Sequence, residues 1–155
     1  DVTTYNTIDV ENPQRVIRAL EICIGTNQPY SSYTGKLKKK RKFNSIIIGL
    51  SGEREKIYER INRRVDLMVE KGLLDEALKL YPNKELNALQ TVGYKELFYF
   101  FEEKITKDEA IQEIKKNTRR FAKRQLTWFK KDPNTYWFNF ETDKIKILKK
   151  IEDLI

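Results

Sequence analysis

The sequence predicts a helix-rich α/β fold, and three observations support this prediction. About six segments have the period of amphipathic helices, whereas two short runs, 43–50 and 136–140, are rich in β-branched or aromatic residues. The composition of 39% hydrophobic and 35% charged residues is typical of a helix-rich globular protein. Strands and helices alternate, and two strands alone bury little. We therefore expect the trailing part of an α/β domain, whose two strands pair with strands outside this chain.

The first elements are predicted from their end signals. Asn12-Pro13 is typical of a helix start, with an N-cap followed by proline at the first helical position, and Gly25 is the expected end of this helix. A polar, basic loop follows, with six positive charges between Lys36 and Lys42. The run FNSIIIGL (43–50) predicts a short buried strand.

Three helices are expected in the middle of the chain. A long one extends from about Glu53 to Lys71 and ends at Gly72, and a short one over 73–80 is closed by Tyr81-Pro82-Asn83. Asn87 is the expected cap of a third helix that continues through ALQTVGYKELFYFFE, although a glycine weakens it.

The last elements surround the most basic part of the sequence. Thr106 and Glu109 have the spacing of a capping box, which predicts the start of the helix that carries TRRFAKRQLTWFKK (118–131). Asp132-Pro133-Asn134 predicts a turn, YWFNF the second strand, and TDKIKILKKIEDLI a terminal amphipathic helix.

The composition excludes several kinds of site. The chain has no histidine, which excludes a histidine-activated nucleophile and a histidine-containing zinc site within it. Its single cysteine, Cys23, excludes an internal disulfide and indicates a reducing, cytoplasmic compartment. The longest apolar run, Ile46–Leu50, is too short to cross a bilayer, so we expect no membrane partner. Because the chain begins without methionine, we expect it to be part of a longer protein.

The positive charge is local. The formal charge is +8, from 31 basic and 23 acidic residues, but residues 115–131 hold eight basic residues and no acidic one. On a helix, most of these basic side chains fall within about 60° of Lys116 and form a basic ridge, whereas the apolar residues cluster on the opposite side. The ridge consists of Lys116, Arg119, Arg120, Lys123, Thr127 and Lys130, and the apolar side consists of Ile111, Ile114, Phe121, Ala122 and Phe129.

A solvated face is the alternative explanation of this ridge. Solvated helices usually carry interspersed glutamates, and the absence of any over seventeen residues favours contact with a phosphate backbone, without sequence specificity. Thr118 and Gln125 fall on the apolar side, where they bond either to the backbone or to another partner. Arg64 projects from the apolar stripe Ile57, Ile61, Val65 and Met68, and either an ion pair or a bound anion would satisfy it.

Four strings in this order resemble the tRNA dimethylallyltransferase family: NPQRVIRALEI (12–22), YERINRRVDLMVEKGLLDEAL (58–78), LQTVGYKEL (89–97) and NTRRFAKRQLTWF (117–129). The resemblance extends from about Asn12 to Trp137 and is to bacterial members. It implies the C-terminal portion of a P-loop kinase-like three-layer fold with part of a helical insert. Residues 1–35 would be the end of the insert, 36–42 a basic loop and 43–155 part of the core.

The resemblance also implies a reaction. The family transfers a dimethylallyl group from dimethylallyl diphosphate to N6 of the adenine 3′-adjacent to the tRNA anticodon, with Mg²⁺ as cofactor. The family's P-loop pattern G-x-x-x-x-G-K-[ST] is absent from this sequence. We expect the P-loop, the general base and the Mg²⁺ ligands to lie in an N-terminal half outside this chain. The chain alone should be inactive, and the whole protein a monomer.

By motif position, Arg64 matches the family arginine that contacts the diphosphate. The expected tRNA contacts belong to the insert, to a loop-to-helix stretch and to the basic helix; they are Gln14, Arg15, Arg18, Gln90, Thr91, Gly93, Lys116, Thr118, Arg119, Arg120 and Lys123. Trp128 and Phe129 are expected in the core or a channel wall. Two alternatives remain: a non-catalytic RNA-binding module, and a DNA-binding helix–turn–helix protein, which would need a base-reading recognition helix.

Overall fold

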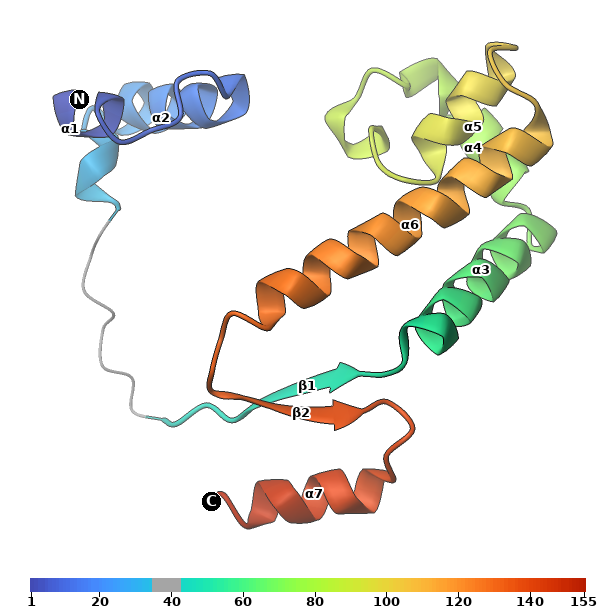
Figure 1. Ribbon diagram of the computed structural model, residues 1–155. Coiled ribbons are helices and arrows are strands. Elements are labelled where there is room, and N and C mark those ends of the chain that lie inside the picture. Colours follow the sequence, from blue (N-terminus) through green and yellow to red (C-terminus); the bar gives the residue numbers. More distant parts are fainter. Residues whose placement is uncertain (35–42) are drawn as a thin grey trace. The chain divides into compact units, whose positions relative to one another are not determined.

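The computed structural model describes residues 1–34 and 43–155, which fall into two units, Asp1–Asn44 and Ser45–Ile155. Figure 1 shows the order of the elements in each unit. The predicted basic loop, 36–42, lies outside the described residues.

The first unit consists of α1 (Val2–Tyr5), α2 (Pro13–Thr26) and the 3₁₀ turn η1 (Tyr30–Ser32). The predicted start of α2 is confirmed, because the Asn12 side chain accepts a hydrogen bond from the backbone N–H of Arg15. The predicted end at Gly25 is wrong. The helix continues to Thr26 and ends where Asn27 adopts a left-handed φ of 53°, a conformation that asparagine tolerates better than most residues.

The second unit contains a parallel pair of strands, β1 (Ile47–Ser51) and β2 (Thr135–Asn139), with Ile47 opposite Thr135 and Ser51 opposite Asn139. The sequence analysis did not predict that the two strands pair with each other, and their expected pairing with strands outside this chain stays a prediction. Glycine permits the close packing here, since a Cβ at Gly49 would lie 2.7 Å from the Trp137 ring.

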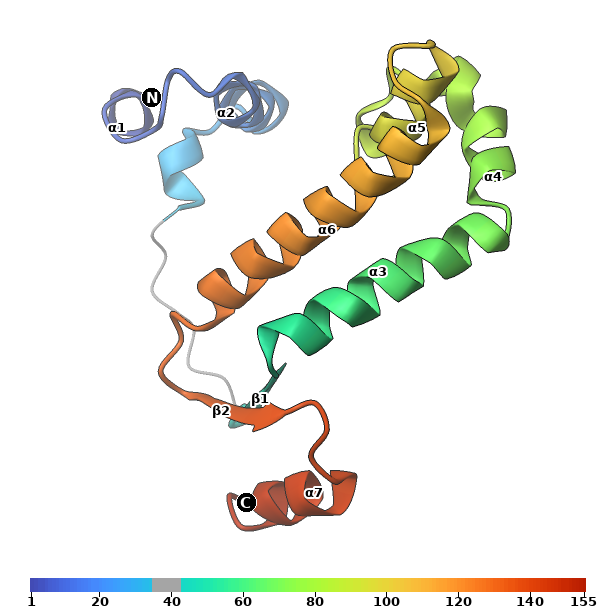
Figure 2. The same ribbon diagram turned by 45° about the vertical axis from the view of Figure 1, so that its right-hand side comes forward.

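Four helices form the body of this unit: α3 (Arg54–Glu70), α4 (Leu73–Leu80), α5 (Tyr94–Phe101) and α6 (Lys107–Phe129). The helices α3 and α6 lie side by side and run in opposite directions in both ribbon views (Figures 1 and 2). The core lies between α3, α4, α5 and one end of α6, and its buried residues are Val65, Leu73, Ala77, Leu97, Phe98, Ala110 and Ile114.

Two predictions about helix ends have opposite outcomes. The capping box of α6 is confirmed: the Thr106 N–H donates to Glu109 Oε2 at 2.7 Å and the Glu109 N–H donates to Thr106 Oγ1 at 3.2 Å. The single helix expected from Asn87 onwards is wrong. A 3₁₀ turn, η3 (Asn87–Leu89), is followed by a loop, and α5 begins only after Gly93, whose φ is 110°. This backbone conformation is rare for residues other than glycine.

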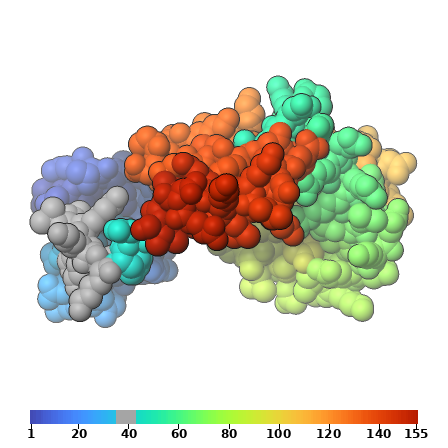
Figure 3. Space-filling view, turned by 90° about the horizontal axis from the view of Figure 1, so that it is seen from below, coloured from blue at the N-terminus to red at the C-terminus, as the bar shows by residue number. Residues whose placement is uncertain are grey.

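The terminal helix α7 (Lys144–Glu152) follows β2, and the Asp143 side chain caps it by accepting from the Ile145 N–H at 2.9 Å. The space-filling view shows β2 and α7 together at the front of the second unit, in red (Figure 3). The short 3₁₀ turn η2 (Tyr81–Asn83) follows α4. Within the described ranges, no helix is long and apolar enough to span a membrane.

Candidate nucleic-acid interface and adjoining pocket

The basic part of α6 does not form one uniform ridge. Arg119 is half-buried against α3, where its Nη1 donates to Asn62 Oδ1 at 2.6 Å and its guanidinium lies 5.8 Å from the centre of the Tyr58 ring. Lys115 also faces α3 and pairs with Asp66 at 2.6 Å. These contacts hold α6 against α3, so Arg119 leaves the open surface on which the sequence placed it.

The other side of α6 is an open basic groove of about 470 Å³, lined by Arg120, Lys123, Arg124, Thr127, Trp128 and Lys131. We call it the basic groove. None of its four cations has a carboxylate partner among the residues that the structure describes. Unpaired cations along a concave surface attract a phosphate backbone, because binding releases the counterions of the nucleic acid. The predicted contacts Arg120 and Lys123 both line this groove.

Lys116 and Thr118 have partners within α6. The Lys116 ammonium pairs with Glu113, in the turn before the acid-free stretch. Thr118 Oγ1 donates to the carbonyl of Ile114 at 2.7 Å, which answers the open question of its partner: it is the backbone. Gln125 instead lines a second pocket, on the opposite side of α6 from the basic groove.

This second pocket has a volume of about 640 Å³ and is formed by β1, β2, α3 and α6. Its lining is mainly apolar and includes Ile57, Ile61 and Trp137, with Arg60 and Arg64 as its basic groups. The Arg60 guanidinium lies 4.6 Å from the centre of the Phe140 ring, so Phe140 holds it in place at the wall. We call it the arginine pocket.

Arg64 does not project into the core, contrary to the sequence interpretation. It is exposed, and the core residue of this helix is Val65, which is 3% exposed. Ile57 and Ile61 line the arginine pocket, so the apolar stripe of α3 is divided between this pocket and the core. Arg64 has no ion pair within residues 1–34 and 43–155, which leaves its guanidinium available to an anion in the pocket.

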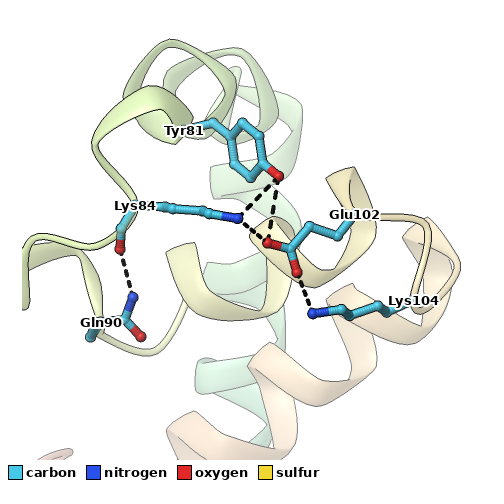
Figure 4. A network of polar contacts seen from close by, with 5 residues as sticks. All are labelled: Tyr81, Lys84, Gln90, Glu102 and Lys104. Atoms are coloured by element: carbon cyan, nitrogen blue, oxygen red, sulfur yellow. Dashed lines mark hydrogen bonds and ion pairs between the residues drawn. The ribbon is translucent and has the colours of Figure 1, made fainter.

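The loop that carries Gln90, Thr91 and Gly93 is anchored at its first end. Gln90 Nε2 donates to the carbonyl of Lys84 at 2.6 Å, while its amide oxygen points away (Figure 4). Thr91 is exposed, and its carbonyl accepts from the Lys95 N–H at 3.2 Å.

A charged network fixes Lys84 in turn. Its ammonium contacts the Glu102 carboxylate and lies 3.5 Å from the Tyr81 hydroxyl, and Glu102 also pairs with Lys104 at 2.6 Å (Figure 4). Hydrogen bonds from Lys104 and Lys84 lower the pKa of Glu102 to about 2, and those bonds raise the pKa of both lysines.

The far end of this loop depends on a residue that the sequence analysis missed. Glu96 is buried, its Oε2 accepts from the Gly93 N–H at 2.8 Å and its Oε1 accepts from Asn117 Nδ2 on α6 at 2.8 Å. A glutamate three residues after a helix start is a capping signal that could have identified the first bond. The bond to Asn117 depends on tertiary packing.

The remaining predicted contacts belong to the first unit. Gln14, Arg15 and Arg18 are all exposed on α2. Arg15 lies 3.7 Å from Asp9 and Arg18 lies 3.2 Å from Glu21, and both are surface ion pairs that a stronger anion can replace.

The chain matches the model of a family described as IPP transferase over residues 1–132. It is 59% identical over 155 residues to the tRNA dimethylallyltransferase of Christiangramia forsetii, covering 100% of this chain and 51% of the relative. It is 57% identical over 150 residues to that of Flavobacterium psychrophilum, covering 97% of this chain and 49% of the relative. The chain thus spans about half the length of the curated relatives it matches.

Solved structures show the same fold. The tRNA isopentenylpyrophosphate transferase of Bacillus halodurans superimposes with a TM-score of 0.67 at 41% identity, covering 99% of this chain and 48% of that one. A eukaryotic dimethylallyltransferase, described as acting on tRNA, gives a TM-score of 0.66 at 25% identity, with 90% and 40% covered. The helix-rich α/β fold of this chain is therefore that of one part of these larger enzymes.

Proposed function

Because this chain belongs to the IPP transferase family, we propose that the protein containing it transfers a dimethylallyl group to tRNA. The donor is dimethylallyl diphosphate, and the acceptor is N6 of the adenine 3′-adjacent to the anticodon. The N6 lone pair forms a bond to the prenyl C1 while the C1–O bond breaks, and the diphosphate leaves with that electron pair. A base takes the proton from N6. We assign this base to residues outside the chain, which alone should be inactive.

One observation carries this proposal: the basic groove and the arginine pocket lie on opposite sides of α6. The groove suits a nucleic-acid backbone, which needs cations without carboxylate partners. The pocket suits a molecule with an apolar part and an anionic part, because its lining is mainly apolar and Arg64 brings a planar guanidinium that can form paired hydrogen bonds. A prenyl diphosphate has both parts.

We rank the proposed substrate contacts by the hydrogen-bond and ion-pair partners that each residue already has in the structure. Arg64 is the proposed diphosphate contact. Arg120 and Lys123 are the strongest proposed tRNA contacts, since no carboxylate among the described residues competes for them. Lys116, Thr118 and Arg119 remain proposed contacts, but each would have to share or exchange the partner it has in the structure. Gln90, Thr91 and Gly93, and on the first unit Gln14, Arg15 and Arg18, complete the proposed set.

Mg²⁺ is the proposed cofactor of the complete protein. The residues that the structure describes contain no group of three or more His, Cys, Asp or Glu side chains that could hold a metal ion. As part of this proposal, we assign the main Mg²⁺ ligands to residues outside this chain. A cytoplasmic location and a monomeric state belong to the same proposal, and gel filtration of the complete protein tests the second.

Incubation of the complete protein with tRNA and labelled dimethylallyl diphosphate tests the proposed reaction. We expect label in the tRNA, and an unlabelled product when the acceptor adenine is replaced by guanine. If the protein binds tRNA tightly but transfers no label in the presence of Mg²⁺, the transferase proposal fails. That outcome favours the alternative of a non-catalytic RNA-binding module.

A further inference from the structure

Glu96 is the only buried ionisable side chain among the described residues, with 6% of its surface exposed. It lies in the first turn of α5, and its two oxygens accept hydrogen bonds from different parts of the fold. Oε2 accepts from the Gly93 N–H, at the end of the loop, and Oε1 accepts from the Asn117 amide on α6, both at 2.8 Å. One side chain therefore connects the loop to the basic helix.

A carboxylate is a costly way to fill space in a core. Burial removes water from the charge, and the cost is offset only where donors replace that water. A leucine would fill the same position without this cost, but it would leave the Gly93 N–H and the Asn117 amide without an acceptor. The two bonds, rather than the volume, therefore explain a glutamate here.

The two bonds fix the loop relative to α6. Gly93 has a φ of 110°, and the hydrogen bond to Glu96 orients its peptide group. Asn117 lies three positions before Arg120 on the same rigid helix. Since Gln90 is anchored to Lys84 at the other end, the loop is held at both ends.

We propose that Glu96 is a positioning residue for tRNA, which holds Gln90, Thr91 and Gly93 in register with the basic groove. This inference rests on the proposed function, because it assumes that the loop and the groove contact the same RNA. Glu96 itself contacts no substrate; it acts through Gly93 and Asn117. The anticodon loop and the phosphate backbone then meet surfaces that are already aligned, which lowers the ordering cost of binding.

The Glu96→Leu variant of the complete protein tests this role. Leucine fills a similar volume but offers no acceptor, so the bonds from the Gly93 N–H and the Asn117 amide are both lost. We expect the KM for tRNA to rise about tenfold, which corresponds to about 1.4 kcal/mol, and the KM for dimethylallyl diphosphate to change less than about twofold. Loss of a negative charge alone would strengthen binding to a polyanion, so the two explanations predict opposite signs.

Glu96→Gln is the conservative variant that should preserve the contacts. The glutamine oxygen can accept from the Gly93 N–H, and its amide can donate to the Asn117 side-chain oxygen once that amide turns over. We expect its KM for tRNA to lie within about threefold of the unsubstituted value. Glu109→Leu is the matched control: Glu109 also caps a helix start, accepting from the Thr106 N–H at 2.7 Å, but it is exposed and contacts neither Gly93 nor Asn117.

The proposal is overturned if Glu96→Leu raises both KM values equally, if Glu109→Leu has the same effect, or if Glu96→Gln is as impaired as Glu96→Leu. If Glu96→Leu does not fold, Asn117→Ala removes one of the two bonds at a less buried position. It must still raise the KM for tRNA while the KM for dimethylallyl diphosphate stays constant. Failure of the proposed function is distinct, since the unsubstituted protein would then transfer no prenyl group. Fluorescence anisotropy with an anticodon stem-loop RNA would still compare the variants.

Discussion

The two sides of α6 carry the same kinds of cation in different surroundings. Lys115 and Arg119 face α3, and each has a polar partner there at 2.6 Å. Arg120, Lys123, Arg124 and Lys131 face the basic groove, where the described residues supply no carboxylate. Arg119 and Arg120 are neighbours in sequence, yet one rotation of about 100° separates a structural contact from an open charge. The basic run of α6 therefore contains cations that have a polar partner on α3 and cations that have no carboxylate partner among the described residues.

The largest expected effect comes from replacing the cations of the basic groove. Replacing Arg120, Lys123 and Arg124 by glutamine should weaken tRNA binding roughly a hundredfold at low salt and reduce the salt slope by about 2 to 3 units, because three proposed phosphate contacts would be lost. Binding measured by anisotropy over a salt series checks this. The matched control replaces Lys144, Lys146 and Lys149 on α7, which removes the same charge outside the groove. Equal slopes for both variants would contradict a localised interface.

Arg64 allows the arginine pocket to be compared with the basic groove on the opposite side of α6. It lines the arginine pocket without an ion-pair partner in the described parts of the chain, so its role should be separable from that of the groove. In the complete protein, Arg64→Ala should raise the KM for dimethylallyl diphosphate about tenfold or more, because the proposed charge-assisted hydrogen bond to the diphosphate would be lost. The KM for tRNA should stay nearly constant.

Arg63→Ala is the control for this variant, since Arg63 is an exposed arginine of the same helix that lies outside the pocket lining. A comparable rise in both KM values for Arg64→Ala would instead indicate a structural role.

Single substitutions of Arg119 and Arg120 compare the cation that has a partner on α3 with the cation that faces the basic groove. Arg119→Gln should lower the free energy of unfolding by about 1 to 2 kcal/mol, because the bond to Asn62 is lost. It should reduce the salt slope by less than Arg120→Gln does, because Arg119 would have to give up Asn62 to contact a phosphate. Arg120→Gln should leave stability nearly unchanged and remove up to about one unit of slope. Urea denaturation and the salt series measure both quantities. If Arg119→Gln also removed about one unit of slope, Arg119 would exchange Asn62 for a phosphate on binding.

Local signals in the sequence predicted the helix starts at Asn12 and Thr106. Asn12 and Thr106 bond within three residues of themselves, so their letters and spacing contain the information. The resemblance to the family also gave the fold class, which four ordered motifs specify. Gly93 was identified as weakening a helix but not as its boundary, because propensity alone does not show a φ of 110°.

Tertiary partners explain what the sequence could not predict. The angular positions of the residues around α6 separated basic from apolar residues. They could not show that α3 supplies Asn62 to Arg119 and Asp66 to Lys115. Glu96 and Asn117 are 21 residues apart, and only the packing of α5 on α6 brings them together. Residues that act by holding other site residues in place, through contacts between distant parts of the chain, are thus the hardest to find from sequence.

The network at Glu102 reverses the arrangement in the basic groove, since one carboxylate lies between two cations, Lys84 and Lys104. These cations lower the pKa of Glu102 to about 2, below its ordinary 4.5. Because the folded state holds the ionised form more strongly, this contribution to stability is complete above pH 4.5 and is lost as the pH falls towards 2.

Glu102→Gln should therefore lower stability at neutral pH, and the difference from the unsubstituted protein should shrink on acidification through this range. Glu103→Gln is the control, because Glu103 is an exposed neighbour without an ion pair among the described residues. Denaturant titrations at several pH values measure the difference. The effect should be smaller than those of the substitutions in α3 and α6, since both lysines remain partly hydrated and exposed pairs contribute little. A difference that grew towards low pH would mean that Glu102 is protonated in the folded protein, and that Lys84 holds the loop through Tyr81 alone.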